Sequence, residues 1–358
     1  MKRRRFISSL AAVALGVVPQ LRGAEPAKPA PSQPDALSRG VSEAMGEVMR
    51  ANGDAICRIE GDDEHGHLSG TGFFVDADGT VLTSYSVGGE SQDITVTVGE
   101  QRYPATRLTA DSRAGLAVLK IVADRPVRFL KFGKSTELTV ASPIITAGYP
   151  FDLPLSPSLG LVTGFDITIR VDGKERFFAT RHICANVAVQ HGQGGAPVLN
   201  LRGEAVGVLI SMFNGERGIF ALPIEAAQKI LHDFRTYGRV RQGWVGLDVR
   251  PAEKPEHGSS ARILTLREDS PAFAGGVRPG DILLQIGAWK ITGPADVMNA
   301  AFFVTSTEPL AMRVSRNGKE MKFTVTPLDP PDGTMPSIER QNPTILSSDE
   351  GKGINLGK

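Results

Sequence analysis

The 358-residue sequence has few cysteines, only Cys57 and Cys184. Two cysteines so far apart argue against a metal site built on thiolates. Both lie in strand-like runs, residues 55–59 and 182–186, and we expect two buried, unpaired side chains. If the protein is exported, an oxidising compartment would also allow a disulfide between them, so pairing stays open.

The sequence also lacks an excess of charge, with 40 Lys and Arg against 39 Asp and Glu. Removal of residues 1–24 would take away five basic residues and no acid, which changes the formal net charge from +1 to −4. That balance gives no reason to expect nucleic acid as a partner. Beyond the N-terminus no run is apolar enough to span a membrane.

The N-terminus has the pattern of an export signal. Basic residues at 2–5 precede an apolar run from Ile7 to Val18 that is too short for a permanent span. The run Arg3-Arg4-Arg5-Phe6-Ile7 also fits a twin-arginine signal, so both general secretory and twin-arginine export stay open. We predict that residues 1–24 are removed and that the mature protein is periplasmic or extracellular.

The remaining chain is long enough for two or three domains. Residues 25–36, rich in Pro and Ala, are predicted to be a linker, and apolar spacing predicts a helix from about 37 to 51. Short strand-like runs then alternate with turns such as Asp78-Gly79 and Asp172-Gly173, the pattern of an all-β fold.

A helix is predicted from Pro223 to Tyr237, before Gly238. A second compact unit with strands and a helix near 295–303 follows from about 240 to 328. The tail, 329–358, has no apolar period and is predicted to be disordered.

Five runs of the sequence form a recognisable series: Thr71–Thr83, Leu116–Ile121, Tyr149–Leu153, Gln190–Asn200 and Tyr237–Leu247. In this order they resemble the HtrA/Deg family of trypsin-like serine proteases. The resemblance implies an all-β-dominated chain: a trypsin-like double β-barrel over 37–236, followed by an α+β PDZ domain over 240–328. Barrel 1 would cover about 53–133, barrel 2 about 134–222, and a closing helix 223–237.

The resemblance also locates the three catalytic positions, and none holds the expected residue. The histidine position carries Ser86, the aspartate position Gly115 and the nucleophile position Gly194. A serine protease needs a hydroxyl nucleophile, a base and an orienting carboxylate. Ser84 and Ser86 bear hydroxyls, but no base lies near them in sequence. We therefore predict a pseudoprotease with no catalytic residue.

Binding functions remain possible at two places. Gly192 and Gly194 can still present the backbone N–H groups of an oxyanion hole. Ile219, where the family has glycine, is expected to crowd the substrate pocket. In the PDZ unit, Trp244-Val245-Gly246-Leu247 matches the carboxylate-binding loop of the family. Val297 and Ala301 lie four residues apart on the helix that flanks the peptide groove, so both can face it. For Val297 and Trp244, a position in the groove and a position in the core are both open.

Three hypotheses follow. The first is an exported HtrA/Deg-like protein that binds peptide C-termini or unfolded proteins through its PDZ domain, as a scaffold, chaperone or regulator of active relatives. The second is an active serine endopeptidase of envelope protein quality control, with catalytic residues elsewhere in the chain. The third is a purely structural envelope protein.

The family resemblance implies a homotrimer or a mixed oligomer with active relatives. No cofactor is expected. Residues 62–67 are interpreted as a polar hairpin tip rather than a metal site.

Overall fold

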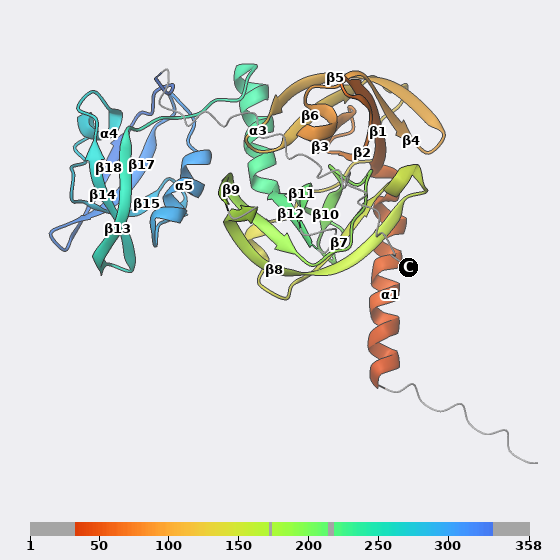
Figure 1. Ribbon diagram of the computed structural model, residues 1–358, viewed down its shortest axis with the longest axis horizontal. Coiled ribbons are helices and arrows are strands. Elements are labelled where there is room, and N and C mark those ends of the chain that lie inside the picture. Colours follow the sequence, from red (N-terminus) through yellow and green to blue (C-terminus); the bar gives the residue numbers. More distant parts are fainter. Residues whose placement is uncertain (1–32, 172–173, 214–217, 332–358) are drawn as a thin grey trace, which may run out of the picture. The chain divides into compact units, whose positions relative to one another are not determined.

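The computed structural model describes residues 33–171, 174–213 and 218–331 (Figure 1). The predicted signal, most of the predicted tail and the turn Asp172-Gly173 lie outside these ranges. The chain divides into two compact units, residues 1–42 and 43–358. No helix in the described ranges is both long and apolar enough to cross a membrane.

Helix α1, Gln33–Asn52, begins earlier than the sequence pattern indicates. Its first four residues were expected to belong to the linker. Pro34 is compatible with a helix there, because the N–H groups of the first turn have no partner within the helix. Near its end, Val48 is buried and Met45 packs beside it, as the apolar spacing predicts.

Six antiparallel strands close the first barrel in the order β1-β2-β3-β6-β5-β4. Gly79, at φ +89°, ends the turn between β2 and β3, which confirms the predicted Asp78-Gly79 turn. The strands are β1 Ile56–Asp63, β2 Gly66–Phe74, β3 Thr80–Ser84, β4 Gln92–Val98, β5 Gln101–Asp111 and β6 Leu116–Ile121. The short helices η1 Gly53–Ala55 and α2 Tyr85–Gly88 flank β1 and β3.

The second barrel also closes with six antiparallel strands, in the order β10-β11-β12-β9-β8-β7. The strands are β7 Pro143–Gly148, β8 Ser156–Val171, β9 Lys174–Ala185, β10 Pro197–Leu199, β11 Ala205–Phe213 and β12 Gly218–Pro223. The short helices η2 Ser135–Glu137 and η3 Pro150–Asp152 lie in its connections. The predicted double-barrel fold is therefore present.

Helix α3, Ile224–Tyr237, ends where Gly238 adopts φ +71°, as the sequence predicts. Phe73 of the first barrel, Val208 of the second and Ile230 of α3 belong to one buried cluster. This shared core fixes the barrels against each other, so loops from the two barrels meet in a defined geometry.

Residues beyond α3 form a separate six-stranded sheet of order β13-β14-β15-β17-β18, with β16 paired to β15. Strand β13 lies at the edge and has no second strand partner among the described residues. The elements are β13 Leu247–Glu256, β14 Ser259–Leu266, α4 Pro271–Ala274, β15 Ile282–Ile286, β16 Trp289–Lys290, α5 Pro294–Phe302, β17 Leu310–Arg316 and β18 Lys319–Val325.

Both cysteines are unpaired. Cys57 is fully buried in the first barrel and Cys184 is partly buried in the second. Burial raises the pKa of the Cys57 thiol far above its ordinary value and that of Cys184 to about 11. Of the two open interpretations, the structure favours two separate thiols.

Candidate active-site remnant

The loop that should carry the nucleophile lies against the helix that should carry the base. A Cβ atom placed on Gly194 would lie 3.2 Å from Ser84 Oγ and 3.9 Å from Ser86 Oγ. The two hydroxyl groups are 3.0 Å apart and share a hydrogen bond. The structure therefore brings together two positions that are 108 residues apart in sequence, with hydroxyls where the resemblance implies an imidazole.

The third position, Gly115, lies beside the same helix. Its carbonyl oxygen accepts a hydrogen bond of 2.7 Å from the N–H of Tyr85, the first residue of α2. A Cβ atom on Gly115 would lie 3.2 Å from Cδ1 of Ile210. Gly115 also has φ +70°, which residues with side chains adopt at a cost. An apolar side chain thus faces the position where an orienting carboxylate would begin.

No imidazole or carboxylate is hydrogen-bonded to Ser84 or Ser86 within the described ranges. His182 is fully buried in the second barrel, with its Nδ1 2.7 Å from the Thr180 carbonyl oxygen. Burial lowers the pKa of His182 to about 4, so it is neutral at pH 7. His191, three residues before Gly194, is exposed, and its ring centroid is 6.1 Å from that of Phe151.

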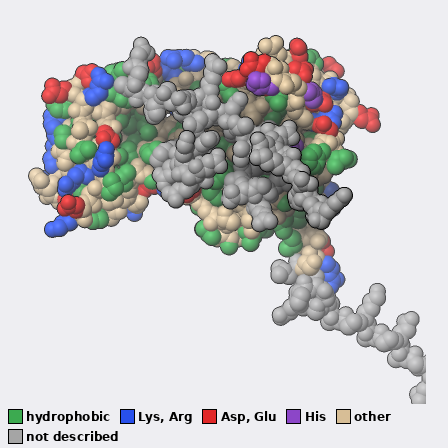
Figure 2. Space-filling view, viewed as in Figure 1, with side chains coloured by type: hydrophobic (Ala, Val, Ile, Leu, Met, Phe, Trp, Pro, Cys, Tyr) green, Lys and Arg blue, Asp and Glu red, His purple; other side chains and the backbone are tan. Residues whose placement is uncertain are grey.

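The remaining histidines have partners of their own. His65 and His67 lie near acidic side chains of the β1–β2 hairpin, as expected for a polar tip. His232 lies 3.9 Å from a Glu308 oxygen, and Nε2 of His257 lies 2.9 Å from the Gly318 carbonyl oxygen. The described residues contain no group of three or more side chains that could hold a metal ion. Figure 2 shows acidic and basic side chains interspersed on the visible face, with no field of one sign.

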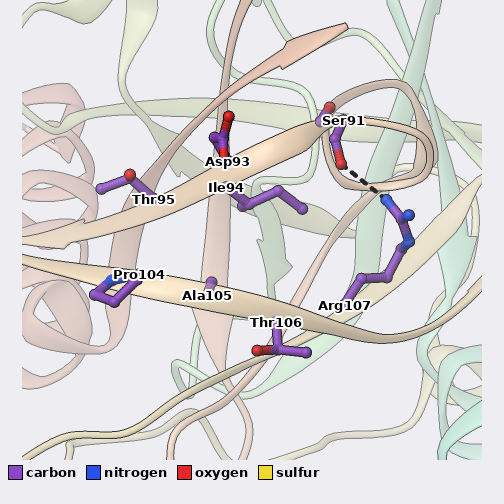
Figure 3. Close-up of a pocket in the computed structure, with 8 residues that line it drawn as sticks. All are labelled: Ser91, Asp93, Ile94, Thr95, Pro104, Ala105, Thr106 and Arg107. Carbon is purple, nitrogen blue, oxygen red and sulfur yellow. Dashed lines mark hydrogen bonds between the residues drawn. The ribbon is translucent and has the colours of Figure 1, made fainter.

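Arg107 anchors the segment at the end of helix α2 through two hydrogen bonds. The guanidinium Nη1 donates to the carbonyl oxygens of Gly88 and Ser91, at 3.3 and 3.0 Å. Figure 3 shows Arg107 reaching Ser91 at one end of a hollow between β4 and β5. These bonds satisfy carbonyls at the C-terminus of α2, where a cation is favourable, and so they fix the segment that carries Ser86.

The glycine loop itself is held by Thr71, a fully buried residue of β2. Its N–H donates to the Gly194 carbonyl oxygen at 2.8 Å, and its hydroxyl donates to the Gly192 carbonyl oxygen at 2.7 Å. The same hydroxyl accepts a hydrogen bond from the Tyr149 N–H at 3.0 Å. Sequence places Thr71 in a strand-like motif but does not reveal this role, because a threonine in a strand gives no signal of its hydrogen-bond partners.

The N–H groups of Gly192 and Gly194 have no acceptor among the described residues. The carbonyl oxygen of His191 accepts from the Phe151 N–H at 2.8 Å, so the trans peptide turns the Gly192 N–H the opposite way. Gly192 and Gly195 have φ near +90°, and a Cβ atom on either would lie 2.2 Å from a carbonyl oxygen, of Tyr149 and Thr71 respectively. The loop therefore requires these glycines, and it keeps two unpaired donors.

One expectation about the cleft is wrong. Ile219 is fully buried and packs in the core of the second barrel with Ile183 and Val198. Its side chain therefore does not crowd a substrate pocket. Side chains alternate along a strand, so Phe220 is the residue of β12 that faces the other way.

In the C-terminal unit, the loop assigned to carboxylate binding has two unpaired donors as well. The N–H groups of Val245 and Gly246 have no acceptor among the described residues, whereas the Trp244 N–H donates to the Leu328 carbonyl oxygen at 2.8 Å. Gly246 has φ +76°, and a Cβ atom there would lie 2.3 Å from Cβ of Ser270. Leu247 then begins the edge strand β13.

The two groove candidates on α5 differ in exposure. Val297 is 7% exposed and belongs to the core cluster of this unit, which Leu247 borders. Ala301 is exposed. The structure thus places Val297 in the core and leaves Ala301 exposed. The Trp244 ring lies beneath the Arg267 guanidinium, at 5.3 Å, and is half-buried.

Comparisons with known proteins agree with this architecture. Residues 70–208 match the family described as trypsin-like peptidase domain. The chain is 30% identical over 294 residues to a "Probable periplasmic serine endoprotease DegP-like" of Ectopseudomonas mendocina, an alignment that covers 79% of this chain and 60% of that protein. A protein of the same name from Halomonas elongata is 29% identical over 288 residues, with 76% and 59% covered. The chain thus spans about 60% of the length of these relatives.

Solved structures show the same fold at lower identity. The structure "HtrA-type protease AlgW with tripeptide" is 22% identical with a TM-score of 0.62, covering 80% of this chain and 98% of that one. The serine endoprotease from Yersinia pestis is 20% identical with a TM-score of 0.55, covering 80% and 98%. The chain therefore has the trypsin-like double-barrel fold and is similar in sequence to DegP-like serine endoproteases.

Proposed function

We propose that this chain is an exported, HtrA/Deg-like protein of the periplasm that binds peptides without hydrolysing them. One observation carries the proposal: Gly194 faces Ser84 and Ser86, and no imidazole or carboxylate of the described residues is bonded to either hydroxyl. Loss of a whole triad costs about a million-fold in rate, and what is left is roughly a thousand-fold over water.

The proposed binding site is the C-terminal unit, acting as a PDZ domain. Two features support this assignment: the unpaired N–H groups of Val245 and Gly246, and the free edge of β13 that begins one residue later. A peptide would add to β13 as a strand while its carboxylate accepts from the loop. The role that follows is recognition of exposed C-termini in protein quality control, as scaffold, chaperone or regulator.

A second candidate is an active serine endopeptidase. The comparisons taken alone favour it, because the related proteins bear that name. It would require a nucleophile and base outside Ser86, Gly115 and Gly194. The family resemblance also predicts a trimer or a mixed assembly with active relatives, which sedimentation of the purified protein would measure.

The experiment measures binding and integrity of the same peptides. Fluorescein-labelled decapeptides with randomised C-terminal residues are incubated with the protein, and bound peptides are recovered and weighed by mass spectrometry. We expect bound, intact peptides for the wild type and much weaker retention by Gly246→Trp. Gly258→Trp is the matched control, since Gly258 also has positive φ but has open space around its Cβ position. Cleaved peptides, or equal binding by both variants, would contradict the proposal.

A further inference from the structure

The glycine loop around Gly194 presents backbone hydrogen-bond donors that could bind an anion. Gly192 and Gly194 have N–H groups without acceptors, and both residues are half-exposed. Backbone N–H groups of a turn that contains residues at positive φ can form a concavity suited to anions. The Gln193 N–H between the two donors is bonded to the Gln190 carbonyl oxygen at 3.2 Å, so the available donors are those of Gly192 and Gly194. Gly192 and Gly195 supply the positive φ values, and Gly194 between them has an ordinary one.

The hydroxyl pair adds a donor at the same place. Among the residues that the structure describes, Ser84 Oγ and Ser86 Oγ are hydrogen-bonded only to each other, so their mutual bond uses one of the two hydroxyl protons. The second proton is available to a ligand. Ser84 is 1% exposed, and its Oγ lies 3.2 Å from where a side chain of Gly194 would begin. The pair therefore faces the space that a nucleophile would fill.

The surroundings do not oppose negative charge. At the position of the orienting carboxylate, Gly115 faces the apolar Ile210. Neither serine is bonded to an acidic side chain in the described ranges. The carbonyl oxygens of Gly192 and Gly194, which would repel an anion, are already engaged by Thr71.

From this arrangement we infer that the loop and the serine pair bind a carboxylate, the free C-terminus of a peptide. One carboxylate oxygen would accept from Gly192 and Gly194. The other would occupy the space beside Gly194 and accept from the Ser84–Ser86 pair. The inference rests on the proposed absence of hydrolysis and adds a second peptide site, distinct from the loop at Gly246.

The test uses full-length protein carrying Gly246→Trp, so that the C-terminal loop does not contribute. The probes are fluorescein-labelled penta-alanine as the free acid and as the C-terminal amide, and their binding is measured by fluorescence anisotropy. We expect the acid to bind about tenfold more tightly than the amide, since hydrogen bonds to a charged group are stronger than those to a neutral one. The preference should disappear in Gly194→Asp, which places a carboxylate in the site.

A second variant does not depend on filling that space. Ser84→Ala with Ser86→Ala should reduce the acid preference by at least about threefold, and Ser158→Ala, in β8, should leave it unchanged. Thermal unfolding confirms that each variant is folded. If the peptides stay intact and the acid and the amide bind with equal affinity, or neither binds, this inference is wrong. If the peptides are cleaved, the proposed function is wrong instead.

Discussion

Replacement of Thr71 by valine tests how the glycine loop is held. Valine keeps the shape of threonine but can neither donate to the Gly192 carbonyl oxygen nor accept from the Tyr149 N–H. Leaving a buried polar group without its partner costs about 1–3 kcal/mol. Gly192 and Tyr149 are only half-buried, so we expect a total loss of about 2–4 kcal/mol in the free energy of unfolding.

The assay is urea denaturation followed by circular dichroism, with Thr71→Ser as the control. Serine retains the hydroxyl and loses one methyl group, so it should cost about 1 kcal/mol. A loss of this size in Thr71→Val is a large part of the stability of an ordinary domain. If Thr71→Val were as stable as Thr71→Ser, the two hydrogen bonds would not hold the loop, and the reasoning about its geometry would be wrong.

Three further predictions concern single residues. Burial lowers the pKa of His182 from 6.5 to about 4, so its contribution to the free energy of unfolding is complete above pH 6.5 and decreases by up to about 3 kcal/mol as the pH drops to 4. In His182→Gln, the free energy of unfolding measured across that range should depend less on pH. Cys57 should resist Ellman's reagent in the folded protein and react in urea, whereas rapid reaction of the native protein would contradict its burial. Gly115→Asp and Gly115→Asn should each lower the free energy of unfolding by about 1–2 kcal/mol, because the new side chain must adopt a positive φ and lie against Ile210. Thermal unfolding measures this loss, and a stabilising effect would argue against that backbone conformation.

Much of the fold follows from local sequence. Alternating apolar strands, the Asp78-Gly79 turn and Gly238 after α3 each have a physical signal that a single stretch of chain carries. Helix α1 began four residues early because proline in a first turn does not oppose a helix. The prediction for Ile219 is wrong because the identity of a residue does not reveal which face of a strand it occupies.

The site was harder to predict than the fold. The three altered positions could be identified from flanking residues, but the contact between Gly194 and Ser84 joins two barrels and needs the tertiary fold. The role of Thr71 depends on three partners far away in sequence. Likewise, the unpaired N–H groups of Gly192 and Gly194 are a property of loop conformation, which composition does not report.

The most direct test of the central claim is proteolysis of unfolded casein by the purified full chain, followed by mass spectrometry. We predict no fragments beyond those of a buffer control and no labelling by a fluorophosphonate probe. Fragments that appear with the wild type and vanish in a Ser84→Ala, Ser86→Ala double variant would contradict the claim, because they would show an activated hydroxyl where the structure offers no base.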